Sequence, residues 1–172
     1  DPGVKSPKTL EIIEETLCKR SKSIKDIKRI FLTHGHIDHF GAAMDIQKMS
    51  GAEIWIHRFD FDKIKRKNRY NDEFTLNYKK ILTQNGCPEK GLTGIDAFWE
   101  YIKDMYDPIL EVNFYQSSFL EFENMRLEII ETPGHTRGSV VFFHAETGVL
   151  FSGDTVIDGI TPNPIIEFLE DG

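Results

Sequence analysis

Hydrophobic and polar positions along the chain repeat with two different periods, and the first half shows the helical period interrupted by short apolar runs. Ser6-Pro7 is typical of a helix start, because serine caps a helix and proline fits its first turn. The apolar run 30–32 predicts a buried strand, and 53–56 predicts another. Between them, apolar residues at helical spacing predict a helix that ends at Gly51.

The segment 59–110 departs from this alternation of helix and strand. Two sets of apolar residues recur in it at helical spacing. The sets are Phe74, Tyr78, Ile81 and Leu82, and then Ile95, Phe98, Trp99, Ile102, Met105 and Tyr106. We expect a helical insertion whose aromatic faces either line a substrate pocket or pack the insertion onto the rest of the domain.

Alternation with a period of two dominates the last third of the chain. The predicted strands are 111–115, 119–122, 126–130, 140–144 and 149–151. A turn at Glu146-Thr147-Gly148 joins the last two, and we expect a mostly antiparallel run. Helices early and strands late indicate an α/β fold.

Composition agrees with one globular domain over residues 1–172, since 40% hydrophobic residues can fill a core. The net charge of −7 disfavours a dedicated nucleic-acid binder and favours a small-molecule substrate. Cys18 and Cys87 lie in no metal-ligand pattern, so we expect structural thiols. Neither a membrane span nor a signal-peptide pattern is visible, which predicts a cytoplasmic protein.

The strongest chemical signal is His34-Gly35-His36-Ile37-Asp38-His39, which directly follows the predicted strand 30–32 and Thr33. A polar loop whose histidines face water is the plainer alternative. Three imidazoles and a carboxylate in six residues favour a metal site, because neutral imidazole nitrogens and carboxylate oxygens are zinc ligands.

Two later segments repeat the arrangement of a strand followed by a polar loop. Pro133-Gly134 forces a turn that presents His135 after the strand 126–130. The run Val149-Leu150-Phe151 delivers Asp154 to another loop. Three strand ends therefore offer candidate ligands to a common rim.

With these residues the chain resembles the metallo-β-lactamase superfamily, whose pattern is H-x-H-x-D-H, a downstream His, an Asp and a final His. The resemblance implies an αββα sandwich in which His34, His36 and His135 bind one metal. It implies that Asp38 and His39 bind a second metal and that Asp154 bridges both. Asp1-Pro2-Gly3 resembles the earliest motif of the family, whose Asp usually contacts the metal ligands and not the metals themselves.

The chain departs from this family pattern in one ligand and in its extent. No histidine follows His144, so the last ligand of the second metal is absent from this sequence. The strands that precede the Asp-Pro-Gly turn in the family are absent too. We therefore expect a domain that is incomplete at both ends, with unpaired sheet edges that favour a homodimer.

The resemblance implies two zinc ions roughly 3.5 to 4 Å apart, with iron or manganese as alternatives, and a metal-bound hydroxide as the nucleophile. Asp38 is the candidate catalytic residue, because it could orient the attacking water. Thr33 or Thr136 could fix ligand histidines through hydrogen bonds. His57 could touch substrate, but a hydrogen-bonded loop histidine is the preferred interpretation, and His144 is expected away from the metals.

Four functions stay open on the sequence alone. The sequence around His135 and Asp154 resembles that of the glyoxalase II-like branch of the family. This resemblance favours hydrolysis of a thioester, ester or lactone. Phosphodiester cleavage by an endoribonuclease is the alternative, supported only by the basic run Lys63, Lys65, Arg66, Lys67 and Arg69. A di-iron reductase would carry Glu at the position of His36, and a non-catalytic metal-binding relic is the fourth reading.

Overall fold

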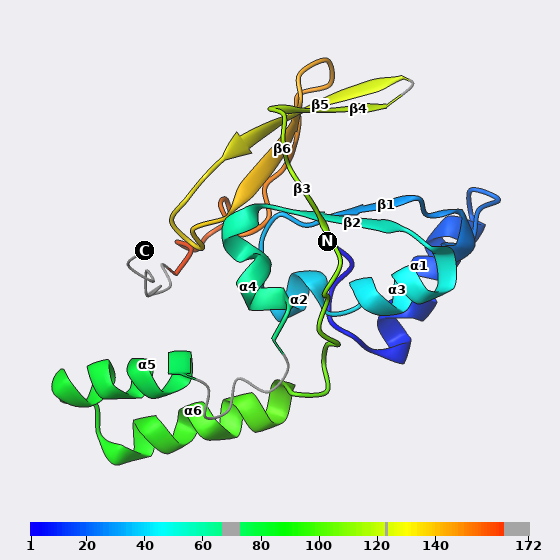
Figure 1. Ribbon diagram of the computed structural model, residues 1–172. Helices are drawn as coiled ribbons and strands as arrows, with labels where there is room; N and C mark the ends of the chain where they lie inside the picture. The colour runs from blue at the N-terminus through cyan, green and yellow to red at the C-terminus, as the bar shows by residue number, and fades with distance from the viewer. Residues whose placement is uncertain (67–72, 123, 164–172) are drawn as a thin grey trace.

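Two β-sheets of different pairing organise the molecule (Figure 1). The computed structural model describes residues 1–66, 73–122 and 124–163. The first sheet has the order β1-β2-β3 and is parallel, whereas the second has the order β4-β5-β6-β7 and is antiparallel. The strands are β1 (Arg29–Phe31), β2 (Glu53–Ile56), β3 (Asn113–Phe114), β4 (Phe119–Phe122), β5 (Met125–Glu131), β6 (Val140–His144) and β7 (Val149–Phe151).

Helices flank the first sheet on the side away from the second sheet (Figure 1). They are α1 (Pro7–Cys18), α2 (Ile37–Phe40), α3 (Ala43–Ser50) and α4 (Phe61–Ile64), with short 3₁₀ helices η1 (Ile24–Asp26) and η2 (Arg58–Asp60). Two further helices, α5 (Glu73–Gln84) and α6 (Glu89–Ile102), follow α4 in the chain. The mixed α/β architecture with two facing sheets agrees with the predicted metallo-β-lactamase sandwich.

The first strand carries apolar side chains into two separate cores. Ile30 packs with the helices in a large cluster that also contains Leu32 and Phe40. Phe31 points to the opposite side, where its ring meets Phe122 and Phe142 at centroid distances of 5.8 and 6.2 Å. This alternation along β1 is what joins the helix layer to the second sheet.

Local signals in the sequence set several element ends. The side chain of Ser6 accepts a hydrogen bond from the backbone N–H of Thr9 at 3.0 Å, and Pro7 begins α1 as predicted. Gly51 ends α3 with φ at +73°, a conformation that glycine adopts without a side-chain clash. The predicted bounds of β2, β4, β6 and β7 are confirmed.

The predicted strand 111–115 does not join the antiparallel run. Its paired part, β3, lies parallel to β2, with Trp55 opposite Asn113 and Ile56 opposite Phe114. The chain returns here from the helical segment to the edge of the first sheet, where Phe114 packs against the helix-side core. Tyr115 then turns to the second core and contacts the Leu32 carbonyl oxygen through its hydroxyl at 2.9 Å.

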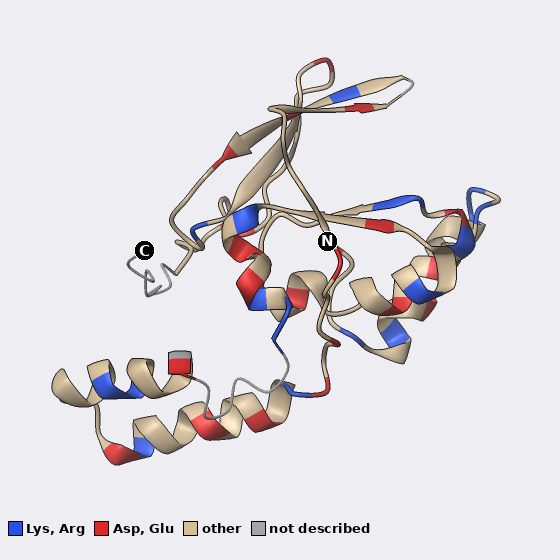
Figure 2. Ribbon diagram, viewed as in Figure 1, with Lys and Arg blue, Asp and Glu red and all other residues tan. Residues whose placement is uncertain are grey.

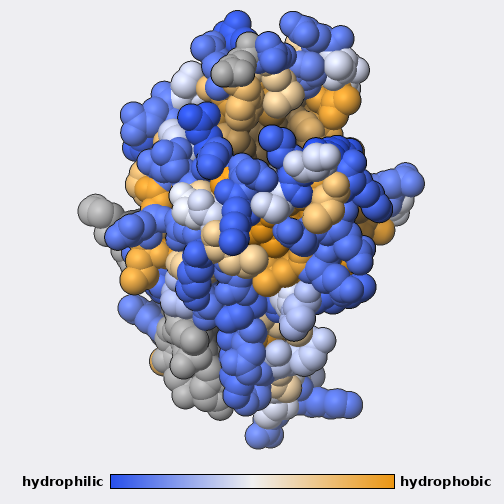
Figure 3. Space-filling model, turned by 90° about the vertical axis from the view of Figure 1, so that its right-hand side faces the viewer, coloured by the Kyte–Doolittle hydropathy of each residue, from blue (hydrophilic) through white to orange (hydrophobic). Residues whose placement is uncertain are grey.

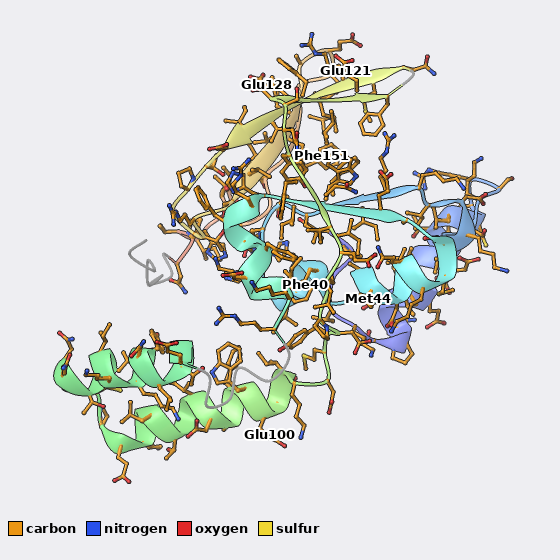
Figure 4. All side chains as sticks on the ribbon, viewed as in Figure 1. Phe40, Met44, Glu100, Glu121, Glu128 and Phe151 are labelled. Atoms are coloured by element: carbon orange, nitrogen blue, oxygen red, sulfur yellow. The ribbon has the colours of Figure 1, made fainter. Side chains whose placement is uncertain are left out.

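The predicted helical insertion is present, but its second helix is shorter than the sequence indicated. The helix α6 ends at Ile102, and Tyr106 lies beyond it, with its ring 5.5 Å from that of Phe40. Phe40, the last residue of α2, lies in the interior, whereas Glu100 of α6 is at the periphery (Figure 4). The helices α5 and α6 lie side by side and apart from the two sheets (Figure 1). It stays a prediction that this segment covers the loops that carry the candidate metal ligands. The side chain of Phe74 lies outside the described part.

The surface carries dispersed apolar side chains. In the face shown in Figure 3, apolar areas alternate with polar ones. The second sheet exposes the apolar residues Ile130 on β5 and Val149, Leu150 and Phe151 on β7. No helix among the described residues combines the length and hydropathy needed to cross a membrane.

Candidate metal centre

The candidate ligands come from three segments, each of which follows a strand. His34 and His36 follow β1, His135 follows β5, and Asp154 follows β7. Asp38 lies on α2, the short helix that directly follows the first loop. A hydrogen bond of 2.9 Å from Val140 N–H to the Thr33 carbonyl oxygen joins the two sheets beside these loops. The facing arrangement of the sheets thereby brings segments about a hundred residues apart to one place.

The first ligand set consists of His34, His36, His135 and Asp154, whose ligand atoms all lie within 4.8 Å of one another. The His36 Nδ1 atom lies 3.0 Å from His34 Nε2 and 2.9 Å from His135 Nε2. Asp154 Oδ2 lies 3.3 Å from His135 Nε2. Four tetrahedral zinc ligands are roughly 3.3 Å apart, so this set fits a zinc ion.

The second ligand set consists of Asp38, His39 and again Asp154. His39 Nε2 lies 3.1 Å from Asp154 Oδ1 and 3.7 Å from Asp38 Oδ2. Asp154 therefore directs one carboxylate oxygen to each set, which is the geometry of a bridging ligand. Among the described residues the second set has three members, one fewer than the first set.

In His34, His39 and His135 the ring nitrogen that faces away from the centre, Nδ1, contacts an oxygen atom that fixes the tautomer. The Thr33 hydroxyl donates to Asp1 Oδ2 at 2.7 Å, so its lone pair is free to accept the proton of His34 Nδ1 at 3.0 Å. Asp1 Oδ2 also lies 3.1 Å from His39 Nδ1, and the carbonyl oxygen of Asn163 lies 2.8 Å from His135 Nδ1. Each of these contacts leaves Nε2 unprotonated toward the centre.

Burial keeps the central imidazoles neutral. It lowers the pKa of His34 to about 2 and the pKa of His36 to about 4, and the neighbouring imidazoles add to the effect in both cases. A neutral imidazole has the free lone pair that a metal needs. His34 and His36 therefore each offer a free lone pair at neutral pH.

The predicted supporting residues behave differently from one another. Asp1 contacts His39 and Thr33 contacts His34, both candidate ligands, in agreement with the predicted supporting role. The Thr136 hydroxyl instead bonds Asp60 at 2.7 Å and lies 2.8 Å from the Ser139 hydroxyl, so its predicted bond to a ligand histidine is replaced by one to a buried carboxylate.

Asp60 is the residue of this centre that sequence reasoning missed. In the sequence it is one of the acids that flank the basic run, yet its side chain is fully buried between the metal loops. The available signal was its place in the loop after β2, whose end lies beside the end of β1. Its neighbour His57 accepts a hydrogen bond from Phe59 N–H and is buried, which confirms the hydrogen-bonded loop histidine.

Other predicted residues lie outside the centre. Basic and acidic residues are interspersed along the chain at α4 (Figure 2). Within the described part of the basic run, Lys63 pairs with Asp60, and Lys65 and Arg66 pair with Asp62. Lys67 and Arg69 lie outside the described residues. His144 lies at the end of β6, as expected, and its Nδ1 atom lies 2.6 Å from the Thr147 hydroxyl. Cys18 and Cys87 are free thiols.

Comparison with known proteins identifies the family. The family model of the metallo-beta-lactamase superfamily matches residues 1–170, and the chain belongs to this superfamily. It is 30% identical over 164 residues to hydroxyacylglutathione hydrolase GloC of Haemophilus influenzae, covering 92% of this chain and 60% of that protein. It is 35% identical over 130 residues to a hydroxyacylglutathione hydrolase of Ectopseudomonas mendocina, covering 76% of this chain and 33% of that protein.

A solved structure agrees with the fold. The crystal structure of a metallo-beta-lactamase family protein from Thermus thermophilus matches with a TM-score of 0.78 and 25% identity. The match covers 95% of this chain and 52% of that chain. The chain thus spans between a third and three fifths of the length of these three proteins.

Proposed function

We propose that the protein is a dinuclear zinc hydrolase that cleaves a thioester of a small molecule. The observation that carries the proposal is the placement of Asp154, whose two carboxylate oxygens face two different ligand sets. His34, His36, His135 and Asp154 would hold the first zinc ion, and Asp38, His39 and Asp154 would hold the second. We propose each of these side chains as a zinc ligand.

Bound zinc would lower the pKa of a coordinated water molecule toward about 7 and would polarise the scissile carbonyl group. The chain contributes the position and the proton path. The Asp38 side chain is 69% exposed, more than any other member of the centre, and therefore lies on the open side where substrate enters. Its carboxylate can accept the proton of the attacking water and pass it to the leaving sulfur.

The choice of a thioester rests on the relatives. A hydroxyacylglutathione is a thioester, and two relatives at 30% and 35% identity carry that substrate in their names. Carboxylic esters and lactones share the same acyl-transfer chemistry and are the nearest alternatives. Phosphodiester cleavage gains no support, because the described cations of the basic run are paired with Asp60 and Asp62.

A substrate panel on zinc-loaded protein tests the proposal. An S-acylglutathione, an aryl ester, a lactone and an aryl phosphodiester would be compared at equal concentration. We expect the thioester to be hydrolysed fastest, with activity lost in chelator and restored by zinc. Faster turnover of the phosphodiester, or no turnover of any acyl substrate by protein with two bound zinc ions, would contradict it.

A further inference from the structure

A buried carboxylate that is not a candidate ligand links the loops of the metal centre. Asp60 is fully buried and accepts four hydrogen bonds, two at each oxygen. Oδ2 accepts from Gly35 N–H and from the Thr136 hydroxyl, each at 2.7 Å. Oδ1 accepts from Gly138 N–H at 3.0 Å and from Lys63 Nζ at 2.9 Å. A carboxylate has about four acceptor sites, so every one is used.

Three of these donors, those of Gly35, Thr136 and Gly138, belong to the two loops that carry the three histidines of the first ligand set, and Lys63 lies on α4. Gly35 lies between His34 and His36, and Thr136 directly follows His135. One carboxylate therefore joins loops separated by about a hundred residues of sequence. Because bonds to a charged acceptor are stronger than neutral ones, the charge of Asp60 holds the two backbones at a defined separation.

Glycine is required at both backbone contacts because of space. A Cβ atom at Gly35 would lie 2.9 Å from the Asp60 carbonyl oxygen, and one at Gly138 would lie 2.7 Å from Asp60 Oδ1. Either distance is shorter than a van der Waals contact. The glycines thus let the peptide N–H groups approach a carboxylate that fills the space between the loops.

Asp60 keeps its charge despite its burial. Burial alone raises its pKa, but the ammonium of Lys63 and the hydrogen bonds from Lys63, Thr136 and Gly35 lower the pKa below the ordinary value. The buried carboxylate is consequently paired and fully hydrogen-bonded, the condition under which a charge is tolerated inside a protein.

We propose that Asp60 is a positioning residue, which sets the separation of the His34–His36 loop and the His135 loop and so preorganises the first metal site. The inference rests on the metal site of the proposed function but not on its substrate. Asn at this position tests the charge, because an amide offers N–H groups at one end. Whichever way the amide is turned, either Gly35 N–H or Gly138 N–H then faces another donor.

The experiment compares Asp60→Asn with Asp62→Asn, a matched control on α4 whose carboxylate is exposed and pairs with Lys65. Zinc affinity would be measured by competition with a chromogenic chelator, at a temperature where circular dichroism shows each protein folded. We expect Asp60→Asn to bind the first zinc about 10- to 100-fold more weakly. The visible spectrum of the cobalt-substituted variant should change as well, because it reports ligand geometry. Asp62→Asn should match the wild type in both.

Zinc affinity of folded Asp60→Asn within about twofold of the wild type would overturn the proposal, even if the variant melts at a lower temperature. If Asp60→Asn does not fold, the pair Thr136→Val and Thr136→Ser decides, because only serine keeps the hydroxyl that donates to Asp60. Valine should weaken zinc binding and serine should restore it, and equal affinities would refute the role. If the wild-type protein binds zinc but hydrolyses no acyl substrate, the proposed function is contradicted and the inference about Asp60 is not.

Discussion

Removal of the shared carboxylate is the sharpest test of a two-metal centre. In Asp154→Ala the first set falls from four ligands to three and the second from three to two. Structural zinc sites contribute about 10 to 16 kcal/mol, which is about 3 kcal/mol for each of four ligands. At about 1.4 kcal/mol per tenfold change, each site should lose roughly 100-fold in affinity. Both metals should therefore weaken together.

The assay is zinc titration with metal content measured after dialysis, beside hydrolysis of the best acyl substrate. Asp104→Ala, an exposed carboxylate after α6, is the matched control and should leave affinity and activity unchanged. Asp154→Asn adds a finer test, because its single carbonyl oxygen can face only one set. It should therefore spare one site more than the other. Unchanged metal content and activity in Asp154→Ala would refute the bridging assignment.

The same geometry leads to three further predictions. The first set should bind zinc more tightly than the second, because it offers four side chains against three, and two equally tight sites in a zinc titration would contradict this. The metal-free protein should lose stability as the pH falls below about 6.5, because His34 and His36, with pKa values of about 2 and 4 in the fold, bind protons only after unfolding. His36 alone accounts for about 2 kcal/mol near pH 5. An unfolding free energy, measured in urea, that stays constant between about pH 7 and 5 would count against this prediction. Phe98→Ala, at an exposed position of α6, should raise KM without changing metal content if the helical segment contacts substrate, and an unchanged KM would assign the aromatic face to packing.

The elements and the ligand chemistry were largely readable in the sequence because they depend on neighbours along the chain. The start of α1 at Pro7 follows from a cap and a proline, and the end of α3 follows from the glycine at position 51. The cluster 34–39 carries its donors within six residues, so no tertiary information is needed to suspect a metal. Strand ends then predicted that His135 and Asp154 would meet it.

The tertiary structure decided the features that depend on contacts between distant segments. Residues 113–114 join the first sheet because the chain returns beside β2. Beyond the end of α6 at Ile102, Tyr106 packs on Phe40, a contact between segments far apart in the sequence. The hydrogen bonds of Asp60 join it to positions 25 and 78 residues away. A lone aspartate beside lysines resembles a surface charge in sequence, because its burial and its four donors exist only once the two sheets have brought the loops around it.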